Sequence, residues 1–235
     1  MKLNDTASLL SVIEQDLART REQLQKNASS GHKLLADHAG VIDDLPLAKL
    51  LFITASFGTY RSEELRWVAV GIELLRLAAD KHYPPAEVAM VAPRNLYLVS
   101  ADYYYAQAIS LAARLNKERV IEYMVKAIAE LAEAEVLKHR EGTIGNKVGD
   151  KSFSLFRAAV KLGALLGECP LNLTNSLTKF ASSFGLIYQA VHHPARADLI
   201  GLNPALLTDA RDRALADLRF IPAAQYRFLE ELISF

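Results

Sequence analysis

The sequence contains one cysteine, no excess of either charge and no long uncharged apolar run. Cys169 alone cannot form an internal disulfide, which is typical of a protein from a reducing compartment. The 27 acidic and 27 basic side chains balance, so we expect neither nucleic acid nor an anionic membrane surface as the main partner. No stretch approaches the roughly 20 apolar residues of a membrane span, and the N-terminus lacks a signal-peptide pattern. These absences predict a cytoplasmic protein with no membrane span.

Apolar residues at helical spacing are abundant. Hydrophobic residues make up 51% of the 235 positions, which is enough to bury a core in one domain spanning residues 1–235. They recur every three or four positions, and no alternating strand pattern or tandem repeat is present. The sequence therefore predicts an all-α bundle of about ten helices. We place them at 6–26, 47–60, 62–80, 95–115, 118–140, 153–166, 171–192, 204–219 and 222–234, with a short helix between 31 and 43.

Prolines and polar segments set these boundaries. Residues 27–31, NASSG, are expected to end the first helix, and Pro84-Pro85 to end the helix at 62–80. The polar segment 142–150 contains glycine and is the expected mobile loop.

The helices at 95–115 and 118–140 have the most regular apolar pattern. In the first, the residues expected to be buried are Leu96, Val99, Tyr103, Ala106, Ile109, Leu111 and Leu115. In the second they are Val120, Tyr123, Met124, Ile128, Leu131 and Val136.

The same two helices resemble a known family. The stretches 100–103, SADY, 105–108, YAQA, and 127–135, AIAELAEAE, are similar to the segment of trans-polyprenyl diphosphate synthases that reads roughly GDYLLARA…AIAELAEGE. Members of that family are all-helical and condense isopentenyl diphosphate onto an allylic diphosphate. The resemblance implies an isoprenoid-synthase-like bundle, truncated near the C-terminus because few residues follow Arg196.

The resemblance fails at the residues that perform the family's chemistry. Tyr83-Pro84-Pro85-Ala86-Glu87 stands where the family has its first Asp-Asp-x-x-Asp motif. The second motif follows Gly-Leu-x-x-Gln, which is kept here at 185–189, but His192-His193-Pro194-Ala195-Arg196 stands in its place. Magnesium needs several hard oxygen ligands, usually carboxylates together with phosphate oxygens. Because these positions supply one carboxylate, the sequence predicts no catalytic residue, no metal ligand and no cofactor bound by this chain.

A few positions of the family's site are retained. Lys151 matches a Lys-Thr pair that touches the allylic diphosphate, and Gln189 keeps its place before the lost motif, so both are possible diphosphate contacts. The alternative for Lys151 is a solvated lysine at a helix start. Ala78 and Ala79 match small positions that leave room for a growing isoprenoid tail, and ordinary helix packing is the alternative.

Histidines offer a second kind of site. His192 and His193, with His82 on the facing helix, have ring nitrogens that suit zinc. Neighbouring histidines point about 100° apart on a helix, and no third ligand is evident. A cationic ring at a helix C-terminus is the simpler interpretation.

A tyrosine cluster indicates a subunit interface. Tyr103, Tyr104 and Tyr105 cover most of a helix circumference, so at least one ring is expected to face away from the chain's own core. Tyrosine suits an interface because it joins a large apolar body to a polar tip. In the family this helix packs across the dimer. We therefore expect an interface formed by Tyr97, Asp102, Tyr103, Tyr104 and Tyr105.

Together these features are similar to the small subunit, component one, of a heterodimeric heptaprenyl or other long-chain prenyl diphosphate synthase. The resemblance implies a non-catalytic pseudoenzyme that stabilises a catalytic large subunit, shapes the product length and serves menaquinone biosynthesis, with Mg²⁺ held by the partner. Two alternatives stay open: an enzyme with altered prenyl-diphosphate chemistry, and a helical protein that binds an isoprenoid or another lipid.

Overall fold

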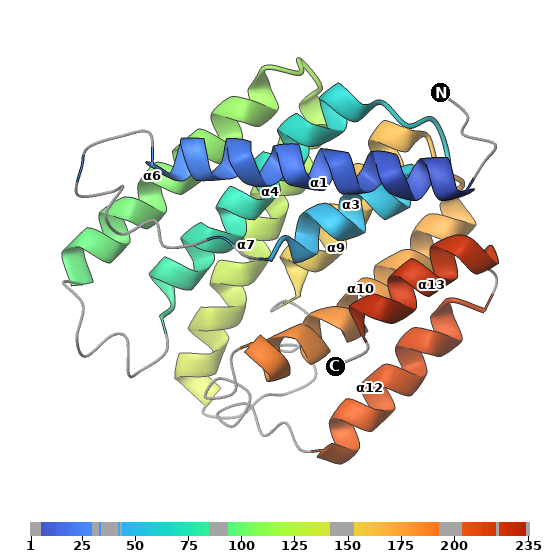
Figure 1. Cartoon of the computed structure of the whole chain (residues 1–235). Coiled ribbons are helices and arrows are strands. Elements are labelled where there is room, and N and C mark those ends of the chain that lie inside the picture. The colour runs from blue at the N-terminus through green and yellow to red at the C-terminus, as the bar shows by residue number, and fades with distance from the viewer. Residues whose placement is uncertain are drawn as a thin grey trace.

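A computed structural model of the chain describes residues 6–29, 33, 42, 44–84, 94–141, 153–192, 204–219 and 221–233. Within these ranges the regular elements are all helices, so the predicted all-α fold is confirmed. The helices pack side by side, and α1 lies across the front of the bundle in Figure 1. Their bounds are α1 Thr6–Ser29, α3 Pro46–Ala55, α4 Ser62–His82, α6 Arg94–Ala113, α7 Glu118–Glu141, α9 Ser154–Gly167, α10 Leu171–His192, α12 Pro204–Asp217 and α13 Ala223–Leu232.

The helix α3 occupies the centre of the bundle because almost all of its surface is apolar. Every residue of α3 except Lys49 is buried, and the helix packs against α4 and α9. It ends at Ala55, so the prediction of a helix continuing to Tyr60 was wrong. The chain turns instead at Gly58, where a Cβ atom would overlap the carbonyl oxygen of Gly167 at the end of α9.

Asp16 attaches α1 to the start of α4. Its carboxylate is 1% exposed and accepts hydrogen bonds from the Tyr60 hydroxyl at 3.0 Å, the Ser62 hydroxyl at 2.7 Å and Arg66 Nη1 at 2.9 Å. Burial and the neighbouring Asp16 charge raise the pKa of Tyr60 well above its usual value, so the phenol stays a donor. One carboxylate thus joins α1, the α3–α4 turn and α4.

The helix α1 continues through the segment that was expected to end it. It runs to Ser29, and Asn27 Nδ2 donates to the carbonyl oxygen of Gln23 one turn earlier at 2.8 Å. Ala28 is buried, which explains the extension, because packing can outweigh the low helix propensity of such a sequence. The short helix predicted between 31 and 43 and the loop at 142–150 lie largely outside the described residues.

The helix α6 packs on α4 through its smaller side chains. Gly71 of α4 faces α6 so closely that a Cβ there would lie 3.3 Å from the Ala108 carbonyl oxygen. The buried residues of α6 are Ser100, Ala101, Tyr104, Ala108, Leu111 and Ala112. Val99, which is 58% exposed, and Ala106 were predicted to be buried, and both predictions are wrong. The small residues on one face of α6 allow its backbone to approach that of α4. The opposite face of α6, with Val99 and Ala106, therefore points outward.

The helix α7 follows its predicted pattern more closely. Val120, Met124 and Leu131 are buried as expected, but Val136 is 58% exposed and its assignment to the core was wrong. The buried position beside it belongs to Ala134. None of the described helices is long and apolar enough to cross a membrane.

Aromatic rings fill the space between α9 and α10. Phe180, Phe184 and Tyr188 follow at four-residue spacing along α10, with successive ring centroids 6.1 and 6.0 Å apart. Phe156 of α9 meets Phe184 edge-on at 5.6 Å. The helix α12 packs on α10 and α13 reaches α3, so the last two helices close one side of the bundle (Figure 1).

Candidate functional site

The C-terminal end of α4, where the sequence resemblance places the first carboxylate motif, carries aromatic rings. Tyr83 closes the helix, and its N–H donates to the Ala79 carbonyl oxygen at 2.9 Å. Its ring is half-buried, and burial raises the pKa of the phenol. His82 Nε2 lies 3.1 Å from Asp102 Oδ1 on α6, and the imidazole stacks on Tyr105 with centroids 5.2 Å apart. This end of α4 is therefore fastened to α6.

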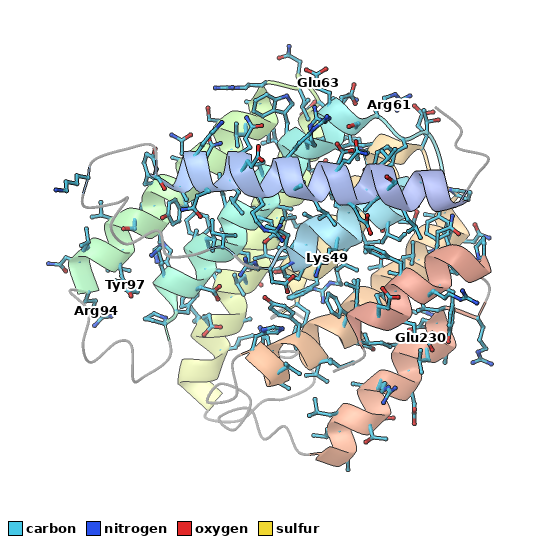
Figure 2. All side chains as sticks on the ribbon, in the orientation of Figure 1. Lys49, Arg61, Glu63, Arg94, Tyr97 and Glu230 are labelled. Carbon is cyan, nitrogen blue, oxygen red and sulfur yellow. The ribbon has the colours of Figure 1, made fainter. Side chains whose placement is uncertain are left out.

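Lys81 makes a second connection between α4 and α6. Its ammonium lies 4.9 Å from the ring centroid of Tyr97 and 5.7 Å from that of Tyr104, within the range of cation–π attraction. Burial lowers the pKa of Lys81. Figure 2 places Tyr97 with Arg94 at the outer end of α6.

The tyrosine cluster divides between the core and the surface. Tyr104 is fully buried, and its hydroxyl lies 3.4 Å from the Ala28 carbonyl oxygen of α1. The structure therefore corrects its assignment to a subunit interface, because a fully buried ring cannot meet a partner. Tyr103 and Tyr105 are half-buried, and Asp102 is exposed. These residues remain accessible.

A buried ion network lies about two turns before the end of α4. Glu73 is fully buried and accepts the N–H groups of Leu47 at 2.8 Å and Ala48 at 2.9 Å at the start of α3. Arg76 Nε donates to the same carboxylate at 2.7 Å. The first-turn amides of α3 would otherwise lack acceptors, so Glu73 acts as a cap supplied by another helix.

Arg76 extends this network toward the end of α4. Its Nη1 lies 3.4 Å from Asp80 Oδ2, and its Nη2 lies 3.4 Å from the Asp44 carbonyl oxygen. The Asp44 carboxylate pairs with Lys49 at 2.7 Å, and Lys49 lies near the middle of the view in Figure 2. Neighbouring carboxylates raise the pKa of Arg76 against the effect of burial, so the guanidinium stays charged. Asp80 is therefore held by a cation of its own helix.

The end of α10 lies beside the same network. Burial raises the pKa of Tyr188, and the nearby charge of Arg76 opposes that rise. The ring of His192 stacks on Tyr188 with centroids 4.3 Å apart, and Gln189 is half-buried. The possible contact between Gln189 and a diphosphate stays a prediction.

The predicted site residues thus fall into two groups. Tyr83, Pro84 and His192 are described, at the ends of α4 and α10, whereas Glu87, Lys151, His193 and Arg196 lie outside the described residues. Ala78 and Ala79 are buried on α4, and their role in lining a product cavity stays a prediction.

The described part of this site does not fit magnesium. Asp80 Oδ2 lies 3.4 Å from Arg76 Nη1, and the exposed Asp102 has Oδ1 3.1 Å from His82 Nε2, so the two described carboxylates face nitrogen donors and do not form the set of oxygen ligands that Mg²⁺ requires. Among the described residues, no three His, Cys, Asp or Glu side chains are placed to hold a metal ion. The described side chains around the C-terminal end of α4 include hydrogen-bond donors, cations and aromatic rings.

Sequence reasoning missed the ion network. The sequence contains a sign of it, because Glu73 and Arg76 stand three residues apart in the apolar middle of α4. Charged side chains in such a helix must be paired when they are buried. The pairing with the start of α3 joins positions far apart in the sequence, so the sequence does not reveal it.

The fold is that of isoprenyl diphosphate synthases. A decaprenyl diphosphate synthase from Rhodobacter capsulatus aligns with a TM-score of 0.74 at 18% identity, covering 97% of this chain and 97% of that one. A geranylgeranyl pyrophosphate synthase from Corynebacterium glutamicum aligns with a TM-score of 0.75 at 16% identity, covering 100% and 95%.

Sequence comparison finds similar proteins. The family model described as Polyprenyl synthetase matches residues 94–192. Heptaprenyl diphosphate synthase component 2 of Geobacillus stearothermophilus is 26% identical over 213 aligned positions, covering 80% of this chain and 65% of that protein. A prenyl transferase of Synechocystis sp. is 23% identical over 269 aligned positions, covering 97% and 83%. Over residues 94–192 the chain is therefore similar to the polyprenyl synthetases, and its relatives are prenyl synthases.

Two details of the comparisons bear on its role. The chain spans less than two-thirds of the length of the Geobacillus relative. That relative, and a Bacillus subtilis protein that is 24% identical over 208 residues, are named component 2. The predicted likeness to component one therefore rests on the missing motifs.

Proposed function

We propose that this chain is the non-catalytic small subunit of a heterodimeric long-chain trans-prenyl diphosphate synthase. The observation that supports this is the state of the two carboxylates nearest the lost first motif. Asp80 is paired with Arg76 and Asp102 lies against His82, while Tyr83, Pro84 and His192 occupy motif positions. A chain that carries cations and rings there is poorly suited to gather magnesium around a diphosphate.

The proposed role requires a surface for a catalytic subunit, and the outer face of α6 suits it. Val99 and Ala106 are exposed there, although the opposite face of the helix already packs on α4. A helix that is apolar on both faces is normally buried on both. The half-buried Tyr103 and Tyr105 border this face and the exposed Asp102 lies on it, a mixture typical of subunit interfaces. Relatives named as components of a synthase also favour a partner.

In this proposal the partner supplies the carboxylates and magnesium, and this chain contributes a rigid surface. The connections from Lys81 and His82 to α6 hold the interface helix against the end of α4. Ala78 and Ala79 on α4 would leave space toward the far end of the product cavity. The complex would act in the cytoplasm, in the synthesis of quinone side chains.

The test is prenyl transfer from farnesyl diphosphate and radiolabelled isopentenyl diphosphate with magnesium. The purified chain, a candidate large subunit from the same source and their mixture are assayed separately. Long-chain product that requires both chains is the expected result. Product from this chain alone would overturn the proposal in favour of an enzyme. The proposal would be overturned in favour of a lipid-binding protein if the purified chain carried an isoprenoid and did not change the activity of the large subunit.

A further inference from the structure

A recess between α7 and α9 gathers positive charge outside the site described above. It is lined by Tyr123, Lys126, Ala127, Glu130, Ser154, Arg157, Ala158 and Lys161. Three of these side chains are cationic and Glu130 is the only anion. The recess is open to solvent and small, with a volume of about 10 Å³, which is room for about one water molecule. A hydrocarbon ligand is too large to enter this recess. An oxyanion needs to insert only one of its oxygen atoms.

The cations around the recess differ in how they are held. Arg157 has a side chain that is 12% exposed and is fixed by Glu130, whose Oε2 lies 3.0 Å from its Nη2. Lys126 is exposed and Lys161 is half-buried, and neither forms an ion pair with another described residue. Two ammonium groups are thus available beside a positioned guanidinium.

The remaining polar groups favour an anion as well. Arg119 donates to the Tyr123 hydroxyl at 3.1 Å, so the hydroxyl's own proton is left to point toward another acceptor. The Ser154 hydroxyl donates to the Ala127 carbonyl oxygen at 2.8 Å, which occupies one backbone acceptor of the lining. The lining thus combines three cations and the Tyr123 hydroxyl with one carboxylate, that of Glu130.

We propose that this α7–α9 recess binds the phosphoryl group of a small anionic ligand through Lys126, Lys161 and Arg157. Ammonium and guanidinium groups form short, strong hydrogen bonds with phosphate oxygens. One oxygen would occupy the recess and the others would stay at its open rim, near the lysines. The site is independent of the proposed subunit role, because it uses neither the outer face of α6 nor the ends of α4 and α10.

The experiment titrates the full chain with inorganic phosphate and with pyrophosphate by isothermal calorimetry at constant ionic strength. Lys126→Ala/Lys161→Ala is compared with Lys26→Ala/Lys33→Ala, which removes two exposed lysines at and beyond α1 and gives the same net charge. We expect the recess variant to bind about tenfold more weakly or worse, since hydrogen bonds to charged groups are lost, and the control to bind as the parent chain does. Equal affinities in both variants would overturn the proposal, and so would a parent chain that binds neither these soluble anions nor the phosphatidic acid vesicles described below.

A charge-neutralising variant tests the same site in the opposite direction. Glu130→Gln removes the competing carboxylate beside Arg157, and we expect it to tighten phosphate binding, whereas Glu14→Gln on the exposed face of α1 should not. Equal tightening by both would mean a general charge effect and would also overturn the site. Circular dichroism on all variants confirms that they are folded.

The phosphoryl group has two conceivable sources, a soluble phosphate and a lipid headgroup. Co-sedimentation with vesicles containing phosphatidic acid distinguishes them. Binding to vesicles that Lys126→Ala/Lys161→Ala abolishes, without a response to soluble phosphate, would assign the same site to a headgroup. A response to pyrophosphate without co-sedimentation would assign it to a soluble ligand.

Discussion

Buried charges in this chain hold the ends of helices in place. Glu73 accepts the first amides of α3, and Asp16 collects three donors from the start of α4 and the turn before it. Removing one member of such a set leaves its partners without an acceptor, which costs more than the net value of the hydrogen bonds. The contribution of each carboxylate can therefore be measured by replacing it with its amide.

Asp16→Asn should lower the free energy of unfolding by about 2 kcal/mol, the scale of a hydrogen bond to a charged group. The amide keeps the size of the side chain but loses the charge that faces Arg66, 2.9 Å away. Urea denaturation measures the change at constant slope. Asp212→Asn on the exposed side of α12 is the control and should stay within about 0.5 kcal/mol. Equal effects of the two substitutions would contradict a structural role for Asp16.

Asp44 gives a prediction for pH. Burial raises the pKa of Asp44, but the hydrogen bond and charge of Lys49 lower it further, so the folded pKa lies below the ordinary value of 3.8. Because the pKa of Asp44 is lower in the folded chain than in the unfolded one, its ionised carboxylate stabilises the folded chain at pH values above the unfolded pKa. That stabilisation is lost as the pH falls through the folded pKa.

Comparison of the parent chain with Asp44→Asn tests that sign. The parent should be more stable by less than about 1 kcal/mol near neutral pH, because the pair with Lys49 is partly exposed. The difference should shrink as the pH falls below 3.8. Denaturation curves across this range supply the measurement, and a difference that does not change with pH would refute the assignment.

Close contacts between helices depend on glycines at particular positions. The helix α9 lies against α3 at Gly163, where a Cβ atom would overlap the Leu51 carbonyl oxygen and come within 3.0 Å of Thr54 Cβ. A backbone oxygen cannot rotate away as a flexible side chain can. The packing of these two central helices therefore requires the absence of a side chain here.

Gly163→Ala should destabilise the chain by about 1–3 kcal/mol, the cost of overpacking, despite the gain of about 1 kcal/mol in helix propensity. Gly71→Ala on α4 is the comparison, with the same propensity gain but looser contacts, Met124 Cε at 3.1 Å and the Ala108 carbonyl oxygen at 3.3 Å. We expect it to be less destabilising than Gly163→Ala. Thermal unfolding of both variants checks this, and a stabilised Gly163→Ala would show that α9 can move away from α3.

The whole molecule presents α6 and α12 on opposite sides of the bundle, as Figure 1 shows. The proposed interface on the outer face of α6 can therefore be disturbed without touching α12. Ala106 is exposed within this chain, so a larger side chain there should affect assembly and leave the fold of the chain unchanged.

Ala106→Arg should weaken association with the catalytic subunit by about tenfold or more, because a long charged side chain would enter a closely packed helix contact. Ala205→Arg, at an exposed position of α12, is the control. Analytical ultracentrifugation of the mixed subunits measures the affinity, and thermal unfolding of each single chain confirms the fold. Undiminished association of Ala106→Arg would place the interface elsewhere.

Much of the fold was predictable from local patterns. The spacing of apolar residues placed the helices, and Pro46 and the proline pair after Tyr83 marked a beginning and an end. The sequence also shows that residues 83–87 differ from the Asp-Asp-x-x-Asp pattern of the family that it resembles. These features depend on neighbours along the chain, so a sequence alone carries them.

The sequence by itself determined the helical class, the family resemblance and the absence of carboxylate pairs at the motif positions. Only the tertiary structure decided that Val99 faces outward, that Tyr104 belongs to the core, and that Glu73 caps α3. Helical periodicity defines a face but does not say which neighbour covers it. Which face is buried is decided when helices distant in sequence pack together. The small residues of α6 let this helix approach α4 more closely than its larger residues would.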